Sequence, residues 1–229
     1  MIITIDGPSG SGKSTTARAV ARRLGYLYLD TGAMYRAVAL AFLRADAAAT
    51  PEAAAELLPG LRVDVRYEDG DMRVFLDRED VTGAIRSQEV GTMASRVSKL
   101  AAVREKLVRE QRRIAREREQ SEGGVVLDGR DTGTVVFPDA DLKIYMQADA
   151  EVRARRRQAE YAERGRPVPY EEVYREIVER DRQDRERALA PLRKADDAVE
   201  LDTTHRTIEE QVDFVVKRTE AYRREGTNP

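Results

Sequence analysis

The chain contains no cysteine, one histidine (His205) and one asparagine (Asn228). Without cysteine it can form neither a disulfide framework nor a thiolate metal site, so nothing in it requires an oxidising compartment. One imidazole cannot build a metal centre, and His205 is expected to be an ordinary solvated loop residue. No stretch approaches the roughly 18 apolar residues of a membrane span, and residues 1–6 lack the features of a signal peptide. We therefore expect a cytoplasmic protein with no membrane partner.

An excess of charge of either sign is also missing. The 40 lysines and arginines nearly balance the 42 aspartates and glutamates, which leaves a formal net charge of -2. Because no large field of one sign attracts a polyanion, we expect no nucleic-acid partner. The 229 residues, of which 41% are hydrophobic, suffice for a substantial core. One α/β domain with small insertions is the default expectation.

Short apolar runs alternate with segments of helical periodicity along most of the chain. The pattern predicts strands at 2–6, 26–29, 125–127, 142–146 and 199–201, and helices at 14–24, 34–43 and about 208–222. Residues 30–32 are predicted to form a loop. Strands alternating with helices favour a parallel sheet flanked by helices, with a ligand at the carboxyl ends of the strands.

Two stretches depart from this alternation. Leu61, Val63, Val65 and Tyr67 alternate with polar residues before a turn at 69–70 and an extended segment at 72–76, which predicts an inserted hairpin. Helical spacing returns from about Ser87. An apolar stripe then runs along a charged helix that ends before Gly123, and it consists of Leu100, Val103, Leu107 and Ile114. Further on, two arginine-rich helices flank residues 165–169. The stripe is most simply core packing.

The segment between the first predicted strand and helix matches the phosphate-loop pattern G-x-x-x-x-G-K-[ST] at every position. It consists of Gly7, Pro8, Ser9, Gly10, Ser11, Gly12, Lys13 and Ser14. Glycines let backbone N–H groups turn toward phosphate oxygens, and the helix amino end adds its positive dipole. Lys13 is expected to reach the β and γ phosphates of ATP, and Ser14 to offer its hydroxyl to Mg²⁺.

Other motifs narrow the class of phosphate-loop protein. The Asn-Lys-x-Asp motif of guanine-nucleotide switches is absent, since the only asparagine is Asn228. A motor or helicase would need a nucleic-acid surface that the charge balance does not indicate. A small-molecule kinase remains.

Five segments, in order along nearly the whole chain, resemble the cytidylate kinase family, in its bacterial type with a long inserted nucleotide-monophosphate lobe. They are residues 5–14, 29–36, 88–90, 128–139 and 180–185. The second and fourth are specific, whereas the phosphate loop is generic. Thr31 departs from the serine that the family often has, but it keeps a hydroxyl.

The resemblance implies a nucleoside-monophosphate-kinase-like α/β fold that transfers the γ-phosphoryl group of MgATP to CMP, and to dCMP, in a monomer. The parts would be a core (about 1–44, 123–150 and 188–229), an acceptor lobe (about 60–100) and a helical lid (about 151–175).

The resemblance also assigns residues. Lys13, Arg130 and Arg187 would be catalytic, and Thr15, Arg153 and Arg157 would join residues 7–14 in binding ATP. The CMP-binding set would be Thr31, Arg36, Ser95, Arg104, Arg130, Asp131, Arg180, Asp184 and Arg187. Within it, Asp131, Ser95 and Arg104 would read the cytosine ring. Asp128, at the end of an apolar strand, would support Mg²⁺ through water, although such a carboxylate can also cap a turn.

Spacing bears on the arginine-rich helices independently. Arg180, Asp184 and Arg187 stand at i, i+4 and i+7, so a helix would place them on one face. The alternative is a solvated helix with ion pairs such as Glu176 with Arg180, and Arg153 and Arg157 could likewise belong to a solvated face.

Two other functions stay open at this point. One is a phosphate-loop kinase for a different small acceptor. The other is a non-catalytic nucleotide-binding regulator, whose expected mark is the loss of Lys13 or of the acceptor-side arginines. None of these residues is missing from the chain.

Overall fold

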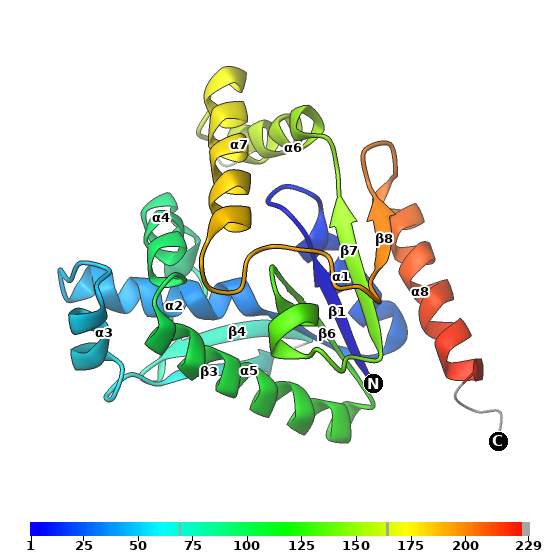
Figure 1. Cartoon of the computed structure of the whole chain (residues 1–229), viewed down its shortest axis with the longest axis horizontal. Coiled ribbons are helices and arrows are strands. Elements are labelled where there is room, and N and C mark those ends of the chain that lie inside the picture. The colour runs from blue at the N-terminus through cyan, green and yellow to red at the C-terminus, as the bar shows by residue number, and fades with distance from the viewer. Residues whose placement is uncertain (69, 164, 226–229) are drawn as a thin grey trace.

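A five-stranded parallel sheet forms the centre of the molecule (Figure 1). The computed structural model describes residues 1–68, 70–163 and 165–225. The strands lie in the order β2 (Leu27–Asp30), β6 (Val125–Gly129), β1 (Ile2–Asp6), β7 (Leu142–Gln147) and β8 (Val199–Asp202). Each neighbouring pair is parallel. The predicted parallel sheet is therefore confirmed, and its strands all end at one edge.

Helices cover both faces of this sheet because its buried strands present apolar side chains to both sides. On one face, Val126 and its neighbours pack against α1 (Lys13–Leu24) and α8 (Ile208–Glu225). On the other face, Val125 and Leu127 pack against α2 (Thr31–Arg44) and α5 (Ala101–Glu122). The result is a three-layer arrangement of helix, sheet and helix.

A second, antiparallel sheet consists of β3 (Val63–Glu68), β4 (Asp71–Leu76) and β5 (Glu79–Asp80). It confirms the predicted hairpin, although residue 69 of the predicted turn lies outside the described residues. The hairpin contributes Val63, Val65 and Val74 to the same hydrophobic cluster as α2 and α5. Tyr67 Oη also donates a hydrogen bond to Tyr28 O at 3.1 Å. The hairpin is thus packed onto the edge of the main sheet.

Three further helices complete this side of the molecule. They are α3 (Pro51–Leu57), the 3₁₀ turn η1 (Ala84–Arg86) and α4 (Gln88–Val97). The apolar stripe on α5 is core packing, as expected, because Val103, Leu107 and Ile114 are buried.

The two arginine-rich helices are α6 (Ala150–Glu163) and α7 (Tyr170–Glu186). Figure 1 shows them beyond the carboxyl end of β7, away from the main layers. They bury a small cluster of their own, made of Ala154, Tyr161, Val173 and Ile177. This cluster is separate from the two cores on the faces of the sheet. Among the described residues, no helix is both long enough and apolar enough to cross a membrane.

Three local features differ from the sequence-based expectations. The predicted loop at 30–32 is wrong, because α2 begins at Thr31 and Asp30 caps it by accepting from Ala33 N at 2.9 Å. Helix α3 was not predicted, although Thr50 caps it and Pro51 occupies its first turn. Residues Thr132–Val136 form a short π-helix (η2), which no periodic pattern indicates.

Candidate active site

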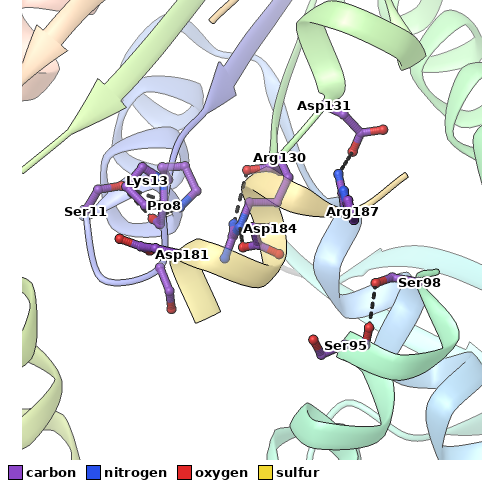
Figure 2. Close-up of polar contacts among 12 residues, drawn as sticks. Pro8, Ser11, Lys13, Ser95, Ser98, Arg130, Asp131, Asp181, Asp184 and Arg187 are labelled. Atoms are coloured by element: carbon purple, nitrogen blue, oxygen red, sulfur yellow. Dashed lines mark hydrogen bonds and ion pairs between the residues drawn. The ribbon is translucent and has the colours of Figure 1, made fainter. Parts of the chain in front are cut away.

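The phosphate loop connects the end of β1 to the start of α1. Gly7 has φ 154°, and a Cβ there would lie 2.1 Å from Met146 O, so only glycine fits. Lys13 is buried, and its Nζ donates to Pro8 O at 2.6 Å and lies 3.5 Å from Ser11 Oγ (Figure 2). Burial, followed by the positive charge of Arg130, lowers the pKa of Lys13 well below its ordinary value. The Lys13 ammonium thus lies against its own loop, close to the guanidinium of Arg130, the residue that directly follows β6.

A cleft of about 1170 Å³ opens in front of this loop. The side formed by the phosphate loop contains Ser9, Gly10, Gly12, Lys13, Ser14 and Thr15. Its opposite side contains Arg36, Ser95, Arg130 and Arg180, and Arg157 reaches it from α6. Residues from six separate regions of the chain thus meet at the carboxyl edge of the sheet, where the alternating pattern placed the ligand.

Ser14 and Asp128 lie together on the floor of the cleft. Ser14 Oγ donates to Asp128 Oδ2 at 2.7 Å, and Tyr28 Oη donates to Asp128 Oδ1 at 2.8 Å. Burial and then Asp128 raise the pKa of the nearby Asp30 to about 6. Among the described residues, no group of three or more His, Asp or Glu side chains could hold a metal by itself. The pair fits Mg²⁺, which takes one or two protein oxygens and completes its shell with phosphate and water.

Arg130 and Asp184 form an ion pair beside Lys13, with Nε and Oδ2 2.8 Å apart (Figure 2). Burial opposes the ionised form of Asp184, but Arg130 and Arg180 together hold the pKa of Asp184 below its ordinary value. Burial and then Arg130 lower the pKa of Arg180 to about 10. Arg180 Nε is buried without a hydrogen-bond partner in the described part of the chain. Positive charge is therefore concentrated where an anion would relieve it.

Arg187 does not share the helical face of Arg180 and Asp184, because α7 ends at Glu186 and Arg187 has extended backbone angles. Its guanidinium turns instead toward Asp131, with Nη2 3.4 Å from Oδ1 (Figure 2). Arg104 Nη2 pairs with the other oxygen of Asp131. Arg104 Nη1 is buried and lacks a hydrogen-bond partner among the described residues. Arg104, Asp131 and Arg187 thus form a buried cluster of charged side chains that does not line the cleft.

Five residues of the predicted CMP-binding set do not line the cleft in this structure. They are Thr31, Arg104, Asp131, Asp184 and Arg187. Thr31 Oγ1 donates to Asp128 O at 2.7 Å, which ties the start of α2 to β6. Arg36 does line the cleft, and its Nη1 donates to Ile85 O at 3.1 Å. Ser95 lies on the far side, on α4 (Figure 2).

The two arginines of the predicted lid occupy different environments. Arg157 lines the cleft and pairs with Glu160 at 3.2 Å. Arg153 is buried behind the phosphate loop, where it donates to Ser9 O at 3.1 Å and to Asp181. The expectation that both arginines extend over the triphosphate is therefore not matched for Arg153, because buried partners occupy its guanidinium.

Three further residues near the phosphate loop were not identified as site residues from the sequence. Tyr28 holds Asp128, Asp6 immediately precedes the loop, and Arg18 lines the cleft with its Cζ 5.4 Å from the Tyr28 ring centre. Arg18 follows Ser14 by one helical turn, and Asp6 ends a strand. These two positions are the sequence signals that could have identified Arg18 and Asp6. Tyr28 has no comparable signal.

A phosphate loop at the carboxyl edge of a parallel sheet, facing guanidinium groups across a cleft, defines a phosphate-loop phosphotransferase. The sequence profile of one family, described as Cytidylate kinase, matches residues 3–221. A Cytidylate kinase from Salinibacter ruber is 61% identical over 227 residues, which cover 99% of this chain and all of the relative. One from Chloroherpeton thalassium is 53% identical, with 93% and 90% covered. The chain belongs to the cytidylate kinase family.

A solved structure of an uncharacterised protein from Eubacterium ventriosum has a TM-score of 0.50 at 12% identity, and the match covers 96% of this chain and 98% of that one. It shows a shared fold alone. The family membership confirms the resemblance seen in the sequence and the assignment to ATP-dependent nucleoside monophosphate kinases.

Proposed function

We propose that this chain transfers the γ-phosphoryl group of ATP to CMP and to dCMP, giving ADP with CDP or dCDP. One observation carries the proposal: Lys13 of the phosphate loop and Arg130 of the acceptor side border the same cleft, close enough for one charge to lower the pKa of the other. Two nucleotides bound end to end would bring their phosphates between these cations.

The chemistry needs charge neutralisation more than a base. An acceptor phosphate has a second pKa of about 6 and is already a nucleophilic anion near pH 7. The barrier lies in bringing two polyanions together and spreading charge on the transferred group. Lys13 would bind the donor phosphates, and Arg36, Arg130 and Arg180, which line the cleft, would hold the acceptor phosphate. Arg187, which pairs with Asp131 and does not line the cleft in this structure, would join them when the lobe and the lid close. Arginine suits this role because its planar fork binds phosphate through two bonds.

Mg²⁺ would be held by the Ser14 hydroxyl, with Asp128 behind it as the acceptor of the Ser14 hydrogen bond. The ion would neutralise charge on the β and γ phosphates.

Base recognition would fall to Asp131, which does not line the cleft in this structure and would meet the base when the lobe closes. The exocyclic amine of cytosine donates a hydrogen bond that a carboxylate accepts, whereas uracil presents an acceptor at that position. Arg104 and Arg187 fix the carboxylate of Asp131 from two sides. Ser95 would contact the ring from α4, and Asp184 would contact the ribose.

We further propose that the chain works as a core (about 1–44, 123–150 and 188–229) with an acceptor lobe (about 60–100) and a lid (about 151–175) that close over the nucleotides. The separate small hydrophobic cluster of α6 and α7 supports a lid that moves as a unit. Closure would exclude water and limit ATP hydrolysis. A monomeric state and a cytoplasmic location stay predictions.

A single assay tests the activity. ADP release from MgATP would be measured with CMP, dCMP, UMP, AMP, GMP and shikimate as acceptors. We expect release with the cytidine compounds far above the rest. Release with another acceptor alone would favour a different phosphate-loop kinase, and an inert panel would favour a nucleotide-binding regulator.

A further inference from the structure

The carboxylate of Asp6 connects the phosphate loop to the segment that carries the acceptor-side residues. Asp6 ends β1 and directly precedes Gly7, and its side chain is buried. Oδ1 accepts from Thr132 N at 2.9 Å and from Thr132 Oγ1 at 2.8 Å, while Oδ2 accepts from Gly133 N at 2.7 Å. Three donors thus converge on one buried carboxylate.

These donors belong to the start of the π-helix η2, immediately after Arg130 and Asp131. The same short turn is held at its other end by Arg112 of α5, whose Nε and Nη2 donate to Val136 O and Val135 O, each at 2.8 Å. Backbone groups at the ends of a helical turn otherwise lack partners. Two charged side chains from different elements therefore fix η2 and, with it, the direction in which Arg130 and Asp131 leave the backbone.

Residues 129–133 pack so closely against β1 and the start of α2 that their backbone has little room to move. A Cβ at Gly133 would lie 2.8 Å from Thr4 Oγ1 of β1, and one at Gly129 would lie 2.7 Å from Thr31 Oγ1. The backbone on either side of residues 130–132 is thus packed directly against neighbouring elements. Burial raises the pKa of Asp6 while its hydrogen bonds oppose that rise. Burying this carboxylate therefore costs free energy, and its hydrogen bonds to Thr132 and Gly133 offset part of that cost.

The phosphate loop itself has ties that do not involve Asp6. Ser11 Oγ donates to Pro8 O at 3.0 Å, Thr203 Oγ1 donates to Ser11 O at 2.9 Å, and Arg153 holds Ser9 O. Losing the Asp6 carboxylate should therefore disturb residues 130–133 more than residues 7–14.

We propose that Asp6 is a positioning residue for the acceptor site, which sets Arg130 and Asp131 relative to the phosphate loop through Thr132 and Gly133. This inference rests on the proposed transfer to CMP. Asp6 does not line the cleft, and its effect is transmitted through the backbone of η2.

The test is steady-state kinetics on Asp6→Asn and Thr132→Val, with ATP and CMP varied separately and UMP as the second acceptor. In Asp6→Asn an amide N–H₂ replaces one acceptor oxygen and faces a backbone N–H. We expect a rise of about tenfold in KM for CMP and a severalfold fall in the preference for CMP over UMP, with KM for ATP changed by less than about twofold. Thr132→Val, which removes one of the three contacts, should give a smaller change in the same direction.

Asp141→Asn is the matched control. Asp141 accepts from Ile2 N at 2.6 Å at the opposite end of β1, and it does not line the cleft. The Asp141→Asn variant should have a lower free energy of unfolding, and its preference for CMP over UMP should be unchanged. The inference is overturned if Asp6→Asn and Thr132→Val keep the wild-type KM for CMP and acceptor ratio, or if KM for ATP alone rises. A wild-type protein without CMP-dependent ADP release would instead refute the proposed function.

Discussion

Arg153 and Asp181 form a buried ion pair with two hydrogen bonds, in which Nη1 and Nη2 lie 3.0 and 2.6 Å from the two carboxylate oxygens. Their side chains are 4% and 9% exposed. Because Arg153 Nη1 also donates to Ser9 O, the pair joins α6, α7 and the phosphate loop at one point.

Replacing Asp181 by asparagine should therefore destabilise the protein. The change leaves the Arg153 guanidinium buried without its counter-charge, which costs about 3–5 kcal/mol in comparable pairs. Urea unfolding followed by circular dichroism would measure the loss. Glu186→Gln on the same helix breaks only an exposed pair with Arg182 and should leave the unfolding midpoint unchanged. Equal midpoints for the two variants would show that the buried pair contributes nothing.

Arg157 should behave differently from Arg153. Arg157→Ala removes a guanidinium that lines the cleft, so we expect turnover to fall by about tenfold, as for the loss of a charge-assisted hydrogen bond, while CMP affinity and stability stay nearly unchanged. Arg153→Ala should lower the midpoint of unfolding. Kinetics and thermal unfolding on both variants separate the roles. If Arg157→Ala weakened CMP binding alone, its placement on the ATP side would be wrong.

Lys13→Met keeps the length of the side chain and removes its charge. Turnover should drop by about 100-fold or more, because the variant loses a cation that stabilises the transferred phosphoryl group. The measurement is initial-rate ADP release at saturating ATP and CMP, with circular dichroism to verify the fold. Turnover within a few fold of the wild type would exclude Lys13 from the reaction.

Asp131→Asn should erode the choice of base. The amide can donate to the uracil carbonyl, so kcat/KM for CMP relative to UMP should fall by about tenfold or more. Competition between the two acceptors in one assay gives the ratio directly. An unchanged ratio would mean that another group reads the cytosine amine.

Asp184 contributes a pH dependence to stability. Its pKa in the folded protein lies below the ordinary value, so its ionised form favours folding above about pH 4, and that contribution disappears as the pH falls through the folded value. Unfolding free energies of the wild type and Asp184→Asn should differ by about 1–2 kcal/mol at pH 7 and converge in acid. A difference that persisted at pH 2 would have to arise from something other than the charge.

The features predicted from the sequence are those encoded locally. The run Ile2–Asp6 followed by glycines and Lys13 specifies strand, loop and helix within a few residues, and the alternating pattern of Val63 and Val65 specifies the hairpin. These signals need no knowledge of distant segments. The main sheet follows from them because parallel strands require helical crossovers.

The remaining features depend on contacts between distant residues. Arg153 and Asp181 are 28 positions apart, and no periodicity distinguishes a buried arginine from the solvated ones on the same helix. Asp6 and Thr132 are 126 positions apart. The prediction that Arg180, Asp184 and Arg187 share one helical face assumed that the helix continues through Arg187. Helix α7 ends before Arg187, which lies four residues ahead of Pro191. Ala190, directly before this proline, has a positive φ of 48°.

The small cluster of Ala154, Tyr161, Val173 and Ile177 has an energetic consequence. Since α6 and α7 bury their apolar side chains against each other, their attachment to the remainder of the molecule depends largely on polar contacts such as that of Arg153 with Ser9. When the two helices separate from the loop, water can replace such a contact, whereas opening the cores on the sheet would expose apolar side chains at a larger free-energy cost. Amide hydrogens of these two helices should therefore exchange with deuterium together and ahead of those in β1 and β6, as one locally unfolding unit.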